Sequence, residues 1–131
     1  KNWSLGLTAA QDLGTGHDGF FADVSAGYGS QLGDQGFGRI GVSARYADAT
    51  YLRSFFEVNQ AQAAISGLDA FDIGSGFESV AVNGLYTYQI SDRWQFAIVP
   101  EVRFAVGDTR RSPITEDDFG YQVVSIIGYQ F

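Results

Sequence analysis

Hydrophobic and polar residues alternate along most of this chain with a period of two, rather than the 3.6 of a helix. The alternation is clearest at 119–131, where the odd-numbered residues are mainly apolar or aromatic. The even-numbered residues of the same segment are smaller or more polar, as at Gln122 and Gln130. Because successive side chains of a β-strand point to opposite faces, this pattern predicts a strand with one apolar face.

The same pattern predicts five further strands. They fall at 3–13, 20–29, 38–47, 78–90 and 94–106. These strands are longer than the roughly 5–6 residues typical of soluble sheets. They are long enough for a tilted crossing of a hydrocarbon core, which takes about 9–11 residues. Pro100 lies inside the fifth of the six strands and predicts a bulge there, because proline has no amide hydrogen for the ladder.

The connections between the expected strands alternate in length. Those at 32–36 and 91–93 are short, whereas those at 14–19, 48–76 and 107–118 are longer or more polar. Transmembrane barrels have short periplasmic turns and longer outer loops. The alternation therefore predicts that the longer connections face outward and that Phe131 ends on the periplasmic side.

The longest connection contains the one helix that we expect. Asn59 is a suitable N-cap for a helix over Gln60–Ser66, and Gly67 suits the position just after its end. The aromatic residues that precede this helix are expected to pack it onto the rim of the sheet. They are Tyr51, Phe55 and Phe56.

The two faces of the expected sheet differ in chemistry. One face has aromatic residues near the strand ends and aliphatic residues between them, as in the lipid-facing surface of outer-membrane barrels. We expect Phe96, Ile98, Val102 and Ile127 to contact lipid. The opposite face carries small residues together with charged residues in mid-strand. The charged residues are Asp23, Arg39, Arg45, Glu101 and Arg103.

A narrow lumen accepts charged side chains when they pair with one another, and small barrels are filled by side chains. We therefore expect the five charged residues to form an interior ion network. The alternative is that they line a pore or a ligand-binding site.

Composition narrows the classes of protein. The 131 residues include 17 Gly and 20 aromatic residues, and 15 acidic residues against 8 basic ones give a formal charge of -7. This acidity argues against nucleic-acid binding. The absence of Cys excludes disulfides, thiolate zinc sites and Cys nucleophiles. The chain has neither an initiator Met nor a signal peptide, so we expect a mature form or a fragment.

Two polar segments are candidates for chemical sites. His17, with Asp12, Asp18 and Asp23, could hold a metal or form a protease pair at the mouth of a barrel. A polar hairpin tip is the better interpretation, because one His lacks a partner that fixes its geometry. The connection 107–118 could bind an anion, a saccharide or Ca²⁺, but its opposite charges favour a self-paired loop. We expect no catalytic site, cofactor or metal.

Three segments carry a resemblance to a known family, and the end of the chain carries a more general one. The stretches FFEVNQAQAAISGLDAFDIGSG, VGDTRRSPIT and QDLGTGHDGFFADV resemble segments of the MltA-interacting protein family, MipA/OmpV. The terminal GYQF is similar to the aromatic-ended last strand of outer-membrane barrels. The resemblance implies that Tyr129 and Phe131 form the signal that the barrel assembly machinery reads.

The resemblance further implies a bacterial outer-membrane protein that scaffolds peptidoglycan-remodelling enzymes, with a lytic transglycosylase as partner. Family members are longer, so residues 1–131 are expected to be a single antiparallel barrel domain that lacks N-terminal strands. Six strands are also fewer than the eight of the smallest single-chain barrels. A small pore or ligand-binding transport barrel is the first alternative, and a soluble β-sandwich binding module is the second.

Overall fold

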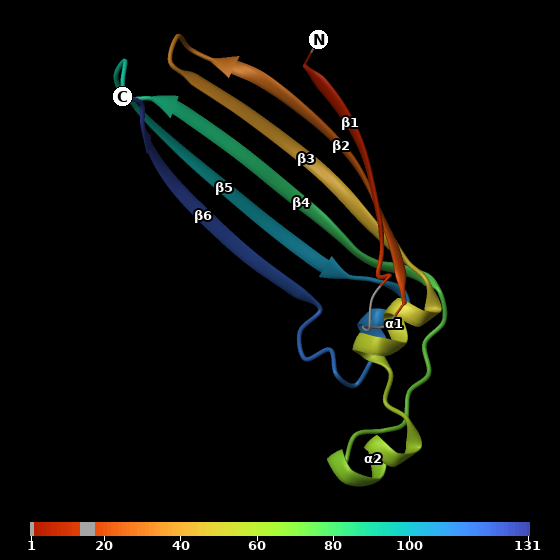
Figure 1. The fold of residues 1–131 in the computed structure, drawn as a ribbon. Helices are drawn as coiled ribbons and strands as arrows, with labels where there is room; N and C mark the ends of the chain where they lie inside the picture. The colour runs from red at the N-terminus through yellow and green to blue at the C-terminus, as the bar shows by residue number, and fades with distance from the viewer. Residues whose placement is uncertain (1, 14–17) are drawn as a thin grey trace.

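In the computed structural model, which describes residues 2–13 and 18–131, the chain forms one antiparallel sheet of six strands in sequence order (Figure 1). The strands are β1 (Trp3–Gln11), β2 (Phe20–Leu32), β3 (Gly36–Ala47), β4 (Gly76–Gln89), β5 (Trp94–Ala105) and β6 (Phe119–Tyr129). The six predicted strands are thus confirmed. Within the described residues the sheet is open, with β1 and β6 at its edges, and the second sheet of a sandwich is not present.

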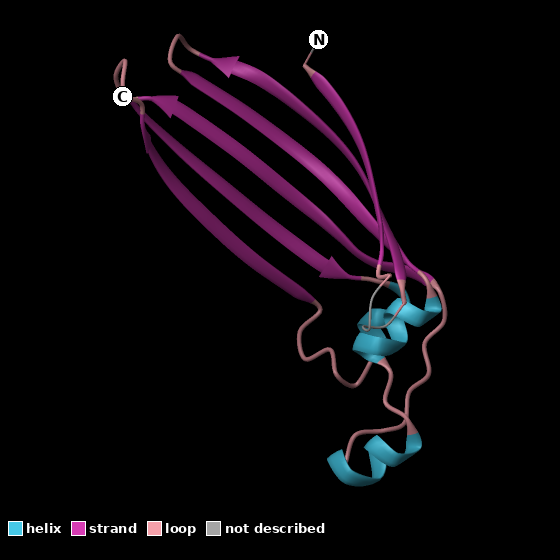
Figure 2. Ribbon diagram, viewed as in Figure 1, coloured by secondary structure: helices cyan, strands magenta, loops and turns pink. Residues whose placement is uncertain are grey.

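The connections sort to opposite ends of the sheet, as the sequence predicts. The β2–β3 and β4–β5 turns lie at one end, which also carries both termini, and we call it the turn end (Figure 1). The helices and longer connections lie at the other end, the loop end (Figure 2). Part of the connection predicted at 14–19, including His17, lies outside the described residues.

Within the described residues, the loop-end connections contain three helices and not one: α1 (Ala49–Phe56), α2 (Gln60–Ser66) and α3 (Gly107–Arg111). The predicted helix α2 is confirmed with its caps. Asn59 and Gln62 form a reciprocal capping box with two hydrogen bonds of 2.9 Å, and Gly67 follows at a φ of 74°. No helix within the described residues is long and apolar enough to cross a membrane.

The expectation that the aromatic residues pack α2 onto the rim is wrong. Tyr51, Phe55 and Phe56 belong to α1, which begins directly after β3 because the Asp48 side chain accepts a hydrogen bond from the Tyr51 amide at 2.7 Å. Helix α1 itself covers the rim, and its Leu52 is only 1% exposed. Leu52 packs with Ala47 and Ile73, and Phe21, Tyr51, Phe56 and Phe71 surround this core.

Helix α2 stands away from the sheet and buries none of its residues (Figure 1). A pair of backbone hydrogen bonds between Val58 and Phe71, of 3.0 and 2.8 Å, closes the base of its segment. Arg53 reinforces this base from α1 through a 3.2 Å ion pair with Asp72. The segment 59–70 is therefore a separate protrusion on a fixed base.

Strand register determines which residues share a face. Directly paired residues of neighbouring strands lie on the same face, and one such row crosses the whole sheet. It consists of Leu5, Ala26, Val42, Val82, Val102 and Tyr121. The row beside it consists of Ser4, Gly27, Gly41, Asn83, Glu101 and Gln122. We call the face of the first row the apolar face and that of the second the polar face.

Aromatic pairs join neighbouring strands near both ends of the apolar face. At the turn end the ring centroids of Trp3 and Tyr28 are 5.1 Å apart, and those of Trp94 and Tyr129 are 4.9 Å apart. At the loop end Tyr46 contacts Phe77 at 5.7 Å, and Phe104 lies 6.4 Å from Phe119. The apolar face thus has an aromatic band near each end.

The bulge predicted at Pro100 is wrong. Pro100 pairs with Val123 of β6 in an unbroken ladder, and on its β4 side the pairing is interrupted without any shift of register. The register shift lies instead between β3 and β4. There Arg45 pairs with Ser79 and Tyr46 pairs with Phe77, which leaves Glu78 as the extra residue of a β-bulge.

The packing of α1 gives the first prediction. Leu52→Ala should lower the free energy of unfolding by about 2–4 kcal/mol, because it leaves a cavity in the rim core. Ile65→Ala in α2 is the control and should change stability little, since Ile65 is 89% exposed. Urea unfolding of both variants in detergent micelles measures the difference. Equal losses would contradict the assignment of the rim core to α1.

Candidate functional site

The charged residues of the polar face gather around one ion pair between β2 and β3. Asp23 and Arg45 are direct partners in the ladder, so their side chains leave the same face at the same level. Arg45 donates two hydrogen bonds to the Asp23 carboxylate, from Nε at 2.8 Å and from Nη2 at 2.9 Å. The two side chains are only 24% and 27% exposed, and the fork geometry gives a strong, directional pair.

A second ion pair lies on β5. Glu101 and Arg103 are two residues apart on one strand and therefore share the polar face. Arg103 Nη2 donates to Glu101 Oε1 at 3.2 Å, and its Nη1 donates to Ser79 Oγ of β4 at 3.0 Å. Arg103 thereby links β5 to a serine that is only 3% exposed.

Aromatic rings connect the first ion pair to α1. The Arg45 guanidinium lies 4.3 Å from the centre of the Phe21 ring, in a cation–π contact. The Phe21 ring is in turn 5.4 Å from that of Tyr51 in α1. The helix that covers the rim therefore also fixes the loop end of the charged cluster.

Arg39 is not brought to this cluster. Its Nη2 donates to Ser4 Oγ of β1 at 3.0 Å, across β2. Gly27 of β2 makes room for this crossing, because a Cβ there would lie 2.6 Å from Arg39 Nη2. Of the five charged residues expected together, the structure thus joins four in two ion pairs and places Arg39 apart.

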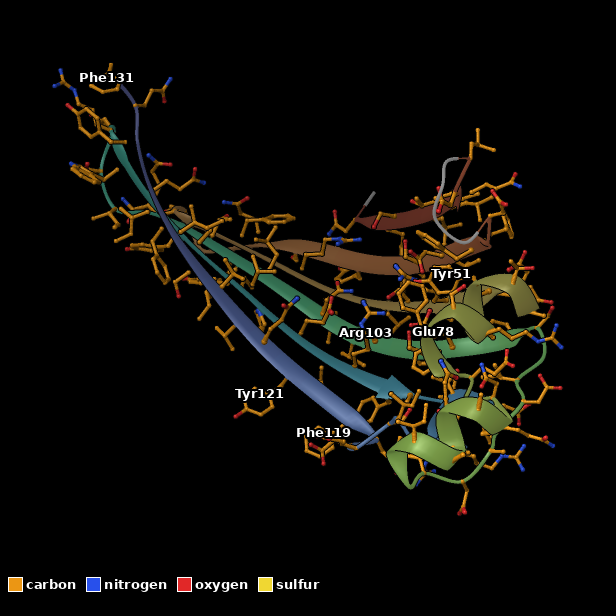
Figure 3. The ribbon with its side chains drawn as sticks, turned by 60° about the horizontal axis from the view of Figure 1, so that its bottom comes forward. Tyr51, Glu78, Arg103, Phe119, Tyr121 and Phe131 are labelled. Atoms are coloured by element: carbon orange, nitrogen blue, oxygen red, sulfur yellow. The ribbon has the colours of Figure 1, made fainter. Side chains whose placement is uncertain are left out.

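Glu78 is not among the residues that the sequence pattern predicts for the polar face. The bulge shifts the alternation of β4 by one residue and turns Glu78 to the side of Ser79, toward the charged cluster. Glu78 lines a cavity of about 460 Å³ together with Arg45, Glu101 and Arg103. Figure 3 shows Glu78 and Arg103 on the side of the sheet that carries α1, with Tyr121 projecting from the opposite side. The signal in the sequence was the adjacent polar pair Glu78-Ser79, which breaks the alternation between Phe77 and Val80.

No cluster of three or more His, Cys, Asp or Glu residues suited to a metal ion occurs within the described part of the chain. The connection 107–118 is self-paired, as predicted. Arg110 forms a 2.7 Å ion pair with Asp118, and Arg111 pairs with Asp108.

The remaining predicted residues lie as follows. Phe96 is the direct partner of Ile127, and Ile98 and Val102 lie further along β5 on the same apolar face. At the turn end, Tyr129 contacts Trp94 at 4.9 Å and Phe131 at 5.1 Å. The end of the chain is thus held against the start of β5.

The geometry of the Asp23–Arg45 pair gives the second prediction. A double-mutant cycle with Asp23→Asn and Arg45→Gln should yield a coupling energy of about 1–2 kcal/mol, because the hydrogen bonds are charge-assisted and partly buried. The matched control is the exposed Arg110–Asp118 pair, whose cycle should give less than about 1 kcal/mol. Urea unfolding of the four variants of each cycle provides the values. A coupling no larger than that of the control would contradict a stabilising role.

Comparison with known proteins gives one match. Neither the search of curated proteins nor that of solved structures returned a match. The model of the MipA family, described as MltA-interacting protein MipA, matches residues 1–131. Proteins of this family are outer-membrane proteins and are linked to MltA, a murein transglycosylase. The chain, matched along its whole length, belongs to the MipA family.

Proposed function

We propose that this chain is a non-enzymatic outer-membrane scaffold that holds a lytic transglycosylase of the MltA type beside the peptidoglycan. The family match over residues 1–131 is the observation that supports this choice of partner enzyme. The observation that supports the membrane is the apolar face of the sheet. Scaffolding requires a surface and an anchor, and the chain offers both without a catalytic step.

The apolar face has exposed aliphatic side chains in the middle of the sheet and aromatic side chains near its ends, as a lipid-facing surface needs. Ile40 and Val42, in the middle of the sheet, are 60% and 51% exposed. A continuous exposed apolar surface of this kind is unstable in water and marks a contact with lipid or protein. The aromatic bands near its two ends match the interfacial girdles of outer-membrane barrels. We therefore assign Phe96, Ile98, Val102 and Ile127 to the lipid-contacting surface.

The exposed sheet edges support a larger barrel. Every residue of β1 and of β6 is exposed, so both edges have free backbone groups and accessible side chains. Unpaired strand edges are not viable in a hydrocarbon core, because no water satisfies their amides and carbonyls. We propose that further strands pair with β1 and β6, and that the six strands are part of one barrel domain.

The polar face then faces the interior of the barrel. Paired charges and small residues suit a filled lumen, and Asp23, Arg45, Glu101 and Arg103 would act there as a structural ion network. Arg39 adds a separate strand-crossing contact. This arrangement favours a plugged scaffold over an open pore.

The ends of the sheet give the orientation of the scaffold. Short turns face the periplasm in outer-membrane barrels, so the turn end is proposed to face the peptidoglycan and the partner enzyme. The same end carries Tyr129 and Phe131, which we propose as the signal for the barrel assembly machinery. The loop end with α1, α2 and α3 is proposed to face outward.

The lipid assignment gives the third prediction. Ile98→Arg should destabilise the folded protein by about 2–4 kcal/mol if it lies near the bilayer midplane. Gln95→Arg, on the polar face of the same strand, is the matched control and should be mild. Unfolding in lipid vesicles compares the two variants. Equal tolerance at both positions would show that the apolar face does not contact lipid.

The partner assignment gives the fourth prediction. Purified MltA-type transglycosylase should bind the folded chain in detergent, as measured by biolayer interferometry. Arg93→Glu at the turn end should weaken binding by roughly tenfold, as expected for a charge reversal within an interface. Arg53→Glu at the loop end is the charge-matched control and should leave binding unchanged. Failure of the unaltered chain to bind would overturn the scaffolding proposal, and a larger effect of Arg53→Glu would overturn the orientation.

A further inference from the structure

A second cavity of the polar face lies at the loop end and has a volume of about 310 Å³. It is bounded by the bulged end of β4, the beginning of β6 and the connection between β5 and β6. Its walls include Phe56, Glu78, Arg103 and Thr109. Glu78 and Arg103 also line the larger cavity described above, so the two hollows meet at these side chains.

Two buried polar atoms at this cavity have no hydrogen-bond partner within the described part of the chain. They are Glu78 Oε2 and Thr109 Oγ1. Thr109 is only 3% exposed, so its hydroxyl is buried. Buried polar atoms are nearly always satisfied, and each exception requires an explanation. A carboxylate oxygen requires a donor, and a hydroxyl can either donate or accept.

The charge around the cavity shows which donor fits. Four carboxylates line it, from Glu78, Glu116, Asp117 and Asp118, against a single cation, Arg103. Arg103 pairs with Glu101, and Asp118 pairs with Arg110 outside the lining. The lining therefore keeps an excess of negative charge, which favours a cation and disfavours an anion.

The chemistry of the walls favours an organic cation. No metal-binding group of His, Cys, Asp or Glu occurs in the part of the chain that the structure describes. Phe56 contributes an aromatic residue to the lining, and Ala105 contributes an apolar one. Such walls suit the methylene groups of an alkyl amine, and an aromatic ring also attracts its ammonium group.

We propose that this loop-end cavity binds an alkyl ammonium ligand, whose ammonium group donates a hydrogen bond to Glu78 Oε2. Thr109 Oγ1 supplies a further polar contact, and Asp117 strengthens the negative field at the entrance. The bulge in β4 orients the Glu78 side chain toward the cavity. This site goes beyond the scaffolding function and does not depend on it, because residues of this chain, and not of the transglycosylase, line the cavity.

Calorimetric titration of the full chain in detergent micelles with the diamine putrescine tests the proposal. Putrescine should bind saturably at one site, and Glu78→Gln should weaken binding by about tenfold, because it removes a charge-assisted hydrogen bond. Asp117→Asn, on the exposed connection, should weaken it by a smaller factor. Asp34→Asn, in the β2–β3 turn at the opposite end, is the matched control and should bind as the unaltered chain does.

Two further probes separate the ligand classes. The neutral isostere 1,4-butanediol should not bind, and Mg²⁺ at equal concentration should not displace putrescine. Binding of the diol as tight as that of the diamine would overturn the ammonium proposal, as would displacement by Mg²⁺. If Asp117→Asn and Asp34→Asn weakened putrescine binding equally, the weakening would come from the net charge of the protein and not from a specific site. That result would overturn the proposed site. If Glu78→Gln does not fold, the comparison of Asp117→Asn with Asp34→Asn still tests the site. Transglycosylase binding is read separately, so failure here leaves the scaffolding proposal standing.

Discussion

The hydrogen-bonded register of the antiparallel ladder is the constraint on which the whole structure depends. A slip of one residue would exchange the two faces of a strand, placing charged side chains among the apolar ones. The ladder places Asp23 directly opposite Arg45, and it joins apolar residues in a continuous row across all six strands. The ion pairs, the aromatic bands and the cavities are consequences of this register. The period-two pattern of the sequence and the register thus agree along most of the chain.

Much of this fold was predictable from residue order. Alternation gave the strands and their faces, and Asn59 with Gly67 gave the caps of α2, because capping depends on neighbouring residues alone. Helix α1 was missed, since its cap Asp48 directly follows a strand and its aromatic residues obscure the helical signal. A bulge at Pro100 could not be decided from the sequence, because the effect of a missing amide on the register depends on both neighbouring strands.

The candidate site, too, could be predicted only in part from the sequence. Asp23, Arg45, Glu101 and Arg103 could be placed on one face by counting, but their pairing required the register between strands. Alternation places Arg39 on the same face, yet Arg39 lies apart from the ion pairs. The sequence does not show that its side chain reaches across β2 to Ser4. The position of Glu78 on the polar face could not be predicted without knowing where the β-bulge lies. The proposed partner enzyme rests on the family match and not on the fold, since a sheet with two chemically distinct faces is compatible with many functions.

The closed base of the α2 protrusion has a practical consequence. Val58 and Phe71 are bonded to each other through their backbones, so the chain enters and leaves the segment 59–70 at two adjacent, fixed points. Changes in length beyond those points need not be transmitted to the sheet, because loop closure costs rise only slowly with length. The tip of α2 is therefore the natural place in this molecule for an epitope or a fluorescent label. A label there would report on the loop end of the molecule while the strands of the sheet keep their register.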